Sequence, residues 1–263
     1  MKKLLIVLFF VFSLFLFNTK NIFGDYAATY QSYITLSDLY RKSYQSYISS
    51  KNKFLTYHTL TSENEAIENG RNFLKTRDQF LLQYLKLLND RTSETGGFSQ
   101  SERDLIFSKL NVESVWLYGH RSKYDTAGSL NDLQRVSDQL QDRYGSVIRY
   151  VALQTAGTII HNKTKIFINT IDDILLRIDT VLKQMGEESF DVSLAQRWLL
   201  EAQNKVSLSK EKQDDANSIF TNLHGQNLVS DYNKAVFLLN ESNQYLREAS
   251  LNISEIIRII KGE

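Results

Sequence analysis

The chain has 263 residues, of which 42% are hydrophobic and 23% charged, with a formal net charge of +1. Because it contains no cysteine, disulfides, thiolate metal sites and a cysteine nucleophile are excluded. The near-neutral charge argues against nucleic-acid binding, and the absence of proline favours long uninterrupted helices over a loop-rich β fold.

The beginning of the chain has the pattern of a secretory signal peptide. A basic start, MKK, is followed by an apolar stretch of 14 residues from Leu4 to Phe17. As a helix this stretch would cover about 21 Å, less than the roughly 30 Å of a membrane's hydrocarbon core. We therefore expect export of the chain, cleavage of a signal peptide at 1–24 between Gly24 and Asp25, and membrane contact only through this segment. An uncleaved membrane anchor is the alternative.

Aromatic residues at heptad spacing predict that a long helix follows. The stripe consists of Tyr26, Tyr33, Tyr40, Tyr47 and Phe54. Residues exactly one heptad apart stay in contact with a partner helix only if the two helices supercoil around each other. Because tyrosine buries a large ring while its hydroxyl reaches water, we interpret the stripe as a packing seam.

A repeated pentapeptide leaves a second interpretation of these tyrosines open. YQSYI occurs at 30–34 and again at 44–48, two heptads later. Regularly spaced rings can also form a surface that binds a partner or a ligand. The candidate residues of such a surface are Tyr30, Tyr33, Tyr44 and Tyr47.

Two further helices are predicted next. The first opens at Thr61 or Ser62, which are favourable N-cap residues. The second opens with Ser99 and Glu102, whose three-residue spacing predicts a capping box. We expect this helix to end near Gly119, because glycine is common just after a helix C-terminus.

A much longer helical pattern then runs from Ser129 to Met185 without a proline or a strong turn cluster. Its second half has a clear heptad pattern, whereas residues 154–165 are β-branched, contain a glycine and are poorly patterned. If the helix breaks anywhere, we expect the break in this segment.

The last part of the chain predicts an antiparallel αα-hairpin over residues 191–263, with a turn at the sequence HGQN. One heptad track of each helix carries small side chains, which allow two helix axes to approach closely. The small residues are Ala195, Ala202, Ser209 and Ala216 in the first helix, and Ala235, Ser242 and Ala249 in the second.

Together these patterns predict an all-α fold in which long antiparallel helices form an elongated coiled-coil or helical bundle. Two bundles that share the long central helix would use every apolar stripe. The N-terminal helical bundle would comprise residues 25–156, and a C-terminal three-helix coiled-coil bundle residues 157–263. A single compact bundle with a broken central helix is the alternative.

No motif in the sequence predicts catalysis, a cofactor or a metal site. Phosphate-binding loops, dinucleotide-binding glycine patterns and nucleophile elbows are absent from it. The acidic pairs at 172–173 and 214–215 point about 100° apart on a helix, so we interpret them as solvated faces. We expect surface or helix-capping roles for the dispersed histidines, which are His58, His120, His161 and His224.

The sequence therefore favours an exported, non-enzymatic coiled-coil protein that acts as a scaffold, adhesion or interaction module at the cell envelope or outside the cell. Its partner would be another protein or a second copy, and not a nucleic acid. The alternative is a sensory helical bundle that binds a small ligand or a peptide between its helices.

Overall fold

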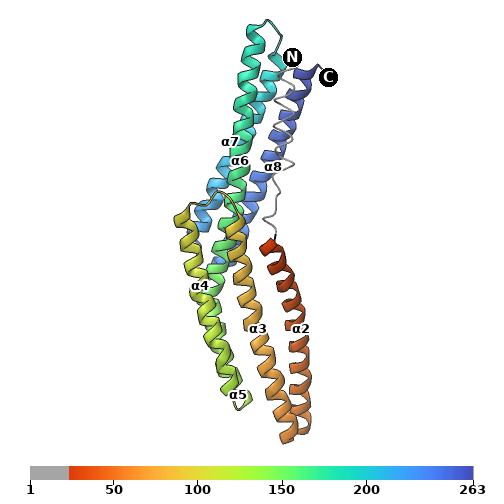
Figure 1. The fold of residues 1–263 in the computed structure, drawn as a ribbon, viewed down its shortest axis with the longest axis vertical. Coiled ribbons are helices and arrows are strands. Elements are labelled where there is room, and N and C mark those ends of the chain that lie inside the picture. Colours follow the sequence, from red (N-terminus) through yellow and green to blue (C-terminus); the bar gives the residue numbers. More distant parts are fainter. Residues whose placement is uncertain (1–23, 263) are drawn as a thin grey trace. The chain divides into compact units, whose positions relative to one another are not determined.

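The computed structural model describes residues 24–262, and within this range all regular elements are helical (Figure 1). The predicted all-α class of long helices is thus confirmed. Most of the predicted signal peptide lies outside the described residues. Gly24 and Asp25, the expected cleavage pair, are the first two residues of helix α2 (Gly24–Tyr57). Cleavage between them stays a prediction.

The chain forms two compact units, and neither of them is a single continuous stretch. Unit 1 comprises the chain up to Glu94 together with Arg121–Leu133, and unit 2 comprises Thr95–His120 together with the chain from Gln134 onward. The expected division into an N-terminal bundle that ends at residue 156 and a C-terminal bundle that begins at residue 157 stays a prediction.

Unit 1 is built on an antiparallel pair of helices, α2 and α3 (Leu60–Glu94), which lie side by side in Figure 1. The chain reverses at His58, whose φ of 50° lies in the left-handed region. Thr59 then caps α3, because its Oγ1 accepts a hydrogen bond from the backbone N–H of Ser62 at 3.2 Å. The predicted N-cap at Thr61 or Ser62 is therefore wrong by two or three residues.

Helix α4 (Gln100–Ser122) begins as predicted and ends later than predicted. The Ser99 N–H donates to Glu102 Oε2 at 2.7 Å, and the Glu102 N–H donates to Ser99 Oγ at 3.2 Å, so the capping box is confirmed. The Ser99 N–H, together with the Ser99 hydroxyl that donates to the same carboxylate oxygen at 2.8 Å, lowers the pKa of the Glu102 carboxyl. Gly119 does not end the helix, which continues into the 3₁₀ turn η1 (Lys123–Thr126).

The long helical pattern is interrupted once, by a π-helical turn. Helix α5 (Leu130–Arg143) passes through η2 (Tyr144–Ile148) into helix α6 (Arg149–Glu187). Residues 154–165, where we expected any break, are α-helical. The irregularity instead lies about three turns earlier, in a segment whose sequence contains no strong helix breaker other than Gly145.

The predicted C-terminal hairpin is formed by helix α7 (Ser193–Thr221), the short 3₁₀ turn η3 (Gly225–Asn227) and helix α8 (Leu228–Lys261). Helices α6, α7 and α8 pack against one another, and Figure 1 shows them side by side. The small residues of the predicted tracks are all buried, which lets the helices approach closely. They are Ala195, Ala202, Ser209, Ala216, Ala235, Ser242 and Ala249.

A polar layer divides the core of this three-helix arrangement. One apolar cluster includes Val206 and Leu246, and the other begins at Ala216 and ends at Leu239. Between them Ser209 and Ser242 are fully buried, with their hydroxyl oxygens 2.7 Å apart. The Ser242 hydroxyl also donates to the backbone oxygen of Ser209 at 2.9 Å, so the two helices are hydrogen bonded inside the core.

Candidate functional site

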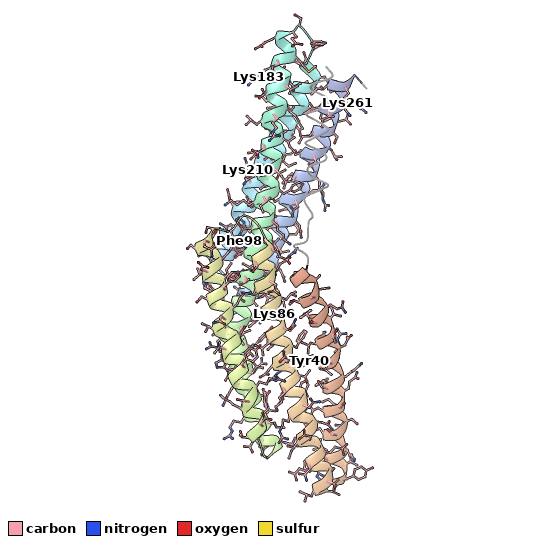
Figure 2. All side chains as sticks on the ribbon, viewed as in Figure 1. Tyr40, Lys86, Phe98, Lys183, Lys210 and Lys261 are labelled. Atoms are coloured by element: carbon pink, nitrogen blue, oxygen red, sulfur yellow. The ribbon has the colours of Figure 1, made fainter. Side chains whose placement is uncertain are left out.

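The tyrosine stripe of α2 packs against aromatic rings of α3. Tyr33 lies 4.9 Å from Phe80 between ring centroids, and Tyr40 lies 5.7 Å from the same ring. Tyr47 stacks on Phe73 at 5.6 Å with an interplanar angle of 3°. Figure 2 shows Tyr40 on α2 beside α3. Burial in this seam raises the pKa of the Tyr33 phenol.

The seam leaves α2 incompletely covered. Within residues 26–57 the buried side chains are small and polar, namely Thr29, Ser43 and Ser50. Thr29 is fixed from both sides, since its hydroxyl donates to Asp90 Oδ2 at 2.7 Å and its carbonyl accepts from Gln83 Nε2 at 3.0 Å. No large apolar side chain in 26–57 is buried, although the helix carries many of them.

We name as the α2 outer face the positions that carry Tyr30, Ile34, Ser37, Arg41, Tyr44 and Ile48. They follow one another in steps of three or four residues, so they share one side of the helix. Tyr30 is 46% exposed, Ile34 38% and Tyr44 47%, while Ile48 is half-buried. Large apolar side chains gathered on one exposed face are typical of an interaction surface.

The structure divides the four predicted surface tyrosines only in part. Tyr33 and Tyr47 lie in the seam with α3, and Tyr30 lies on the α2 outer face. Tyr44 belongs to both, since it is 47% exposed on the outer face and its ring centroid lies 5.2 Å from that of Phe73. Sequence reasoning missed Ile34, Arg41 and Ile48 as neighbours of these exposed rings. The spacing of the repeat contains the signal, because the first and fifth residues of YQSYI share a helix face.

A second exposed apolar region is a shallow groove between α7 and α8 of unit 2. Its volume is about 590 Å³. Leu194, Leu200 and Leu251 line it and are 52%, 60% and 67% exposed. Lys205 Nζ lies 2.9 Å from Glu248 Oε2 across the groove. This pair raises the pKa of Lys205 and lowers that of Glu248.

The most extensive buried polar cluster joins η1 to α3 in unit 1. Arg71 donates from Nε to the Tyr124 backbone oxygen at 3.0 Å and from Nη2 to the Ala127 oxygen at 2.9 Å. Arg77 Nη2 donates to the Tyr124 hydroxyl at 3.0 Å, and that hydroxyl lies 3.5 Å from Asp78 Oδ1. Tyr124 and Asp78 are fully buried. We interpret the cluster as structural, because its charges face one another.

A smaller buried cluster lies between α4 and α5 in unit 2. Arg143 binds both carboxylate oxygens of Glu113 at 2.9 and 2.7 Å, and its guanidinium lies 5.6 Å from the Trp116 ring centroid. Trp116 stacks on His120 at 4.7 Å, and His120 Nε2 lies 2.9 Å from the Val136 oxygen. The expected surface or capping role of His120 is therefore wrong, since the ring is 1% exposed.

The remaining titratable groups of the described residues do not gather into a reactive centre. Within the described residues, no group of three histidine or carboxylate side chains is placed to hold a metal ion. Of the acidic pairs, Asp172 lies 2.6 Å from Lys210 Nζ, and Asp173, Asp214 and Asp215 are exposed.

One histidine differs from the others in its surroundings. His161 is half-buried on α6, and burial lowers the pKa of its imidazole. Its Nδ1 has no hydrogen-bond partner, and the same is true of Nε2 of Gln213, a side chain that is 6% exposed. A buried polar atom without a partner is unfavourable by about 1 to 3 kcal/mol, so these two groups mark a weak place in the core of unit 2.

Neither a protein-family model, nor a curated protein, nor a solved structure matches this chain. In the part of the chain that the structure describes, no helix is both long and apolar enough to cross a membrane.

Proposed function

We propose that this chain is an exported, non-enzymatic coiled-coil protein that acts as a scaffold, adhesion or interaction module at the cell envelope or outside the cell. The observation that carries the proposal is the α2 outer face, where Tyr30, Ile34 and Tyr44 stay exposed on a helix whose other side is already packed against α3. Burial of such a face against a partner lowers the free energy of the system, because it removes apolar surface from water.

The proposed lack of catalysis is supported by the pairing of the buried charged side chains with one another. The carboxylate of Glu113 accepts two hydrogen bonds from the guanidinium of Arg143. The carboxylate of Asp78 lies beside Arg77 and Tyr124. General acid–base catalysis needs a group within hydrogen-bond reach of a substrate. Carboxylates that are fully buried and already paired do not offer that access.

Export is supported by the basic start and the apolar stretch from Leu4 to Phe17. The predicted cleavage after Gly24 would leave α2 at the new N-terminus, with its outer face near the beginning of the exported chain.

Site-specific photo-crosslinking in intact cells tests location and binding together. A photoreactive amino acid at position 44 lies on the α2 outer face, and one at position 39 is the matched control. Leu39 is 49% exposed and lies on the opposite side of the same helix. We expect protein adducts from position 44 and few from position 39. If the chain is exported and cleaved, external protease should reach it and residues 1–24 should be absent from it.

Retention of the chain in the cytoplasm would contradict the proposed export. Equal adduct formation from positions 39 and 44, or none from either, would contradict the proposed use of the α2 outer face.

A second candidate is the sensory bundle that binds a ligand between helices, and it is favoured by His161 Nδ1 and Gln213 Nε2. A ligand that supplied polar atoms to these groups would relieve their lack of partners. Amide hydrogen exchange of residues 154–165 would then slow when envelope extract is added. Unchanged exchange in this segment would remove the candidate.

A further inference from the structure

We infer that the α2 outer face binds the same face of a second copy of this chain, with the two α2 helices antiparallel about a two-fold axis that passes between Ser37 and Arg41. The inference rests on the proposed function as an interaction module, and it specifies the partner and the register. It is drawn from the order of residues on this face, from their exposure and from the charges along the helix.

The order of residues on the α2 outer face is the same in both directions. Its six positions follow in steps of four, three, four, three and four residues. Turning a second helix around therefore places Tyr30 opposite Ile48 of the second copy and Ile34 opposite Tyr44 of the second copy. The repeat YQSYI creates this match, because each occurrence supplies a tyrosine and, four residues later, an isoleucine.

A two-fold dimer needs a surface that is complementary to itself, and this face satisfies that requirement. Each large ring meets an isoleucine, so the four apolar pairs of the dimer have similar sizes. Tyr30 and Tyr44 are nearly half exposed, at 46% and 47%, and their apolar area is available for burial in this contact.

The polar centre of the face selects the antiparallel orientation. Ser37 and Arg41 lie between the two apolar pairs, and Arg41 is exposed. In a parallel dimer in register Arg41 would face Arg41 of the second copy, and like charges in contact are unfavourable. In the antiparallel dimer Arg41 faces Ser37 of the second copy instead, close to that copy's Asp38.

Asp38 supports the same arrangement. Within the chain Arg41 Nη1 lies 3.8 Å from Asp38 Oδ1, and the two side chains are 74% and 61% exposed. An exposed pair of this kind contributes little by itself. At the proposed axis, however, each arginine lies between its own aspartate and the aspartate of the second copy, so the central charges balance.

The remaining charges of α2 also keep the two copies antiparallel. All of its cations lie in the second half, at Arg41, Lys42, Lys51 and Lys53, and of these Lys53 is already paired with Glu65 Oε2 at 2.5 Å. An antiparallel pair places the basic half of each helix beside the half of the second copy that carries no cation. A parallel pair would bring the two basic halves together.

The first experiment measures the oligomeric state of the purified chain across a concentration series by analytical ultracentrifugation. We expect a dimer, and we expect Ile34→Lys to raise the dimer dissociation constant by roughly 100-fold or more, because the charge enters the contact twice. Leu39→Lys, on the opposite side of α2, is the control and should leave the dissociation constant within about threefold of wild type.

The second experiment determines the register, and the absence of native cysteine makes it simple. Chains with Ile34→Cys are mixed with chains with Tyr44→Cys that carry a size tag, and the mixture is oxidised. The antiparallel register predicts the mixed 34–44 disulfide as the main product. Of the three possible pairs of cysteines, 34–34, 44–44 and 34–44, only the last would bring its Cα atoms within about 7 Å. A parallel dimer would instead give the 34–34 and 44–44 products.

The outcomes separate this inference from the proposed function. A monomer at all concentrations, a dimer that Ile34→Lys leaves unchanged, or dominant 34–34 and 44–44 products each overturn the inference. If the chain is monomeric but position 44 forms adducts with a different protein in cells, the proposed function stands and the inference falls. A disulfide-free monomer whose Ile34→Lys variant loses thermal stability would mean that the chain covers this face itself.

Discussion

Gly157 is the residue at which a side chain has the least room. A methyl group at this position of α6 would lie 2.4 Å from Cδ1 of Phe220, a ring that is 2% exposed. Real Cβ atoms do not approach other atoms so closely, so the Phe220 ring would have to leave its place in the core. The glycine is thus required by the contact between α6 and α7, and not by its backbone conformation.

We therefore predict that Gly157→Ala lowers the free energy of unfolding by about 1 to 3 kcal/mol, as overpacking of a filled core does. Gly119→Ala is the matched control, since nothing lies within 4 Å of the methyl position in the exposed helix interior. The control should raise the free energy of unfolding by about 0.5 to 1 kcal/mol. Urea unfolding followed by circular dichroism measures both changes, and equal effects would contradict the prediction.

Tyr124 predicts a pH dependence. Burial raises the pKa of its phenol above the usual value near 10, because the charged form is unfavourable in the core of unit 1. The folded state therefore holds the proton more tightly than the unfolded state. The stability that this provides is fully present below pH 10 and is lost as the pH rises above it.

We expect Tyr124→Phe to reduce the loss of stability between about pH 9.5 and 11, measured as the slope of the unfolding free energy against pH. At pH 7 the variant should be less stable by about 1 to 3 kcal/mol, because Arg77 and Asp78 lose a buried partner. The slope is reduced and not abolished, since burial also raises the pKa of Tyr33 and Tyr232. An alkaline slope equal to that of wild type would contradict the assignment.

Single residues could be predicted from the sequence only where their partners are close along the chain. The capping box of Ser99 and Glu102 is local, and its prediction is correct. His120 was wrongly placed at the surface, because its burial depends on helix α5, where the Val136 oxygen lies 2.9 Å from His120 Nε2. Gly119 was wrongly taken as a helix end, because a glycine in an exposed helix interior has the same sequence signal.

Among the elements, the C-terminal hairpin shows how far a heptad pattern can be followed. The small track residues that we expected in its seam are all buried, from Ala195 in α7 to Ala249 in α8. The pattern was sufficient here because both helices, the turn and the contact between them lie within one stretch of about 70 residues. The π-helical turn η2 could not be predicted, since its sequence does not differ in period from the helices around it.

Leu246 and Leu251 lie on α8 only five residues apart and differ sharply in exposure, at 0% and 67%. We predict that Leu246→Ala lowers the free energy of unfolding by about 2 to 5 kcal/mol, because it removes core contacts and leaves a cavity. Leu251→Ala should change it by about 0.5 kcal/mol or less. Denaturant unfolding of both variants measures the difference, and a ratio near one would mean that α8 packs on another face.

Helix α2 carries two overlapping apolar stripes, and only one of them packs fully against α3. Its sequence carries two apolar stripes, the heptad tyrosines and the α2 outer face, and the repeat YQSYI contributes to both. Which stripe meets α3 depends on the rings of Phe73 and Phe80, which are distant in sequence. The heptad spacing therefore predicted the seam of Tyr33, Tyr40 and Tyr47 correctly, but it did not predict that Tyr44 would contact Phe73 at 5.2 Å while remaining 47% exposed.

At the scale of the whole molecule, the two units differ in their intrinsic fluorophores. The chain has 2 tryptophans, Trp116 and Trp198, and both belong to unit 2. Tryptophan fluorescence therefore follows the unfolding of unit 2, whereas circular dichroism at 222 nm follows the helices of both units.

We predict that Phe73→Ala destabilises unit 1 by about 3 to 5 kcal/mol, because this ring packs on Tyr40 and Tyr47 in the seam. The circular dichroism transition should then begin at lower denaturant concentration, with the fluorescence midpoint unchanged. Leu246→Ala should move the fluorescence midpoint together with the part of the circular dichroism transition that belongs to unit 2. If Phe73→Ala also moved the fluorescence midpoint, the two units would form one cooperative structure.

The division into units could not be predicted, because the sequence signal for a boundary is a linker. The loops near residues 95 and 128 contain glycines, but only the first lies at a boundary, because residue 128 lies inside the unit 1 segment Arg121–Leu133. The chain passes between the two units at three places, and two of these crossings, at 120–121 and 133–134, lie within helices. Composition does not change at such a crossing.

These crossings set the order in which the chain can be completed during synthesis. The pair of α2 and α3 leaves the ribosome first, but residues 121–133, which bring Tyr124 to Arg71 and Arg77, follow only after a piece of unit 2. At about 5 to 20 residues per second, this delay lasts roughly 2 to 8 s. During that interval Tyr124, which contacts Arg71, Arg77 and Asp78 in the folded unit, has not yet been synthesised or has not yet reached α3. A nascent chain halted there would be a natural substrate for chaperones.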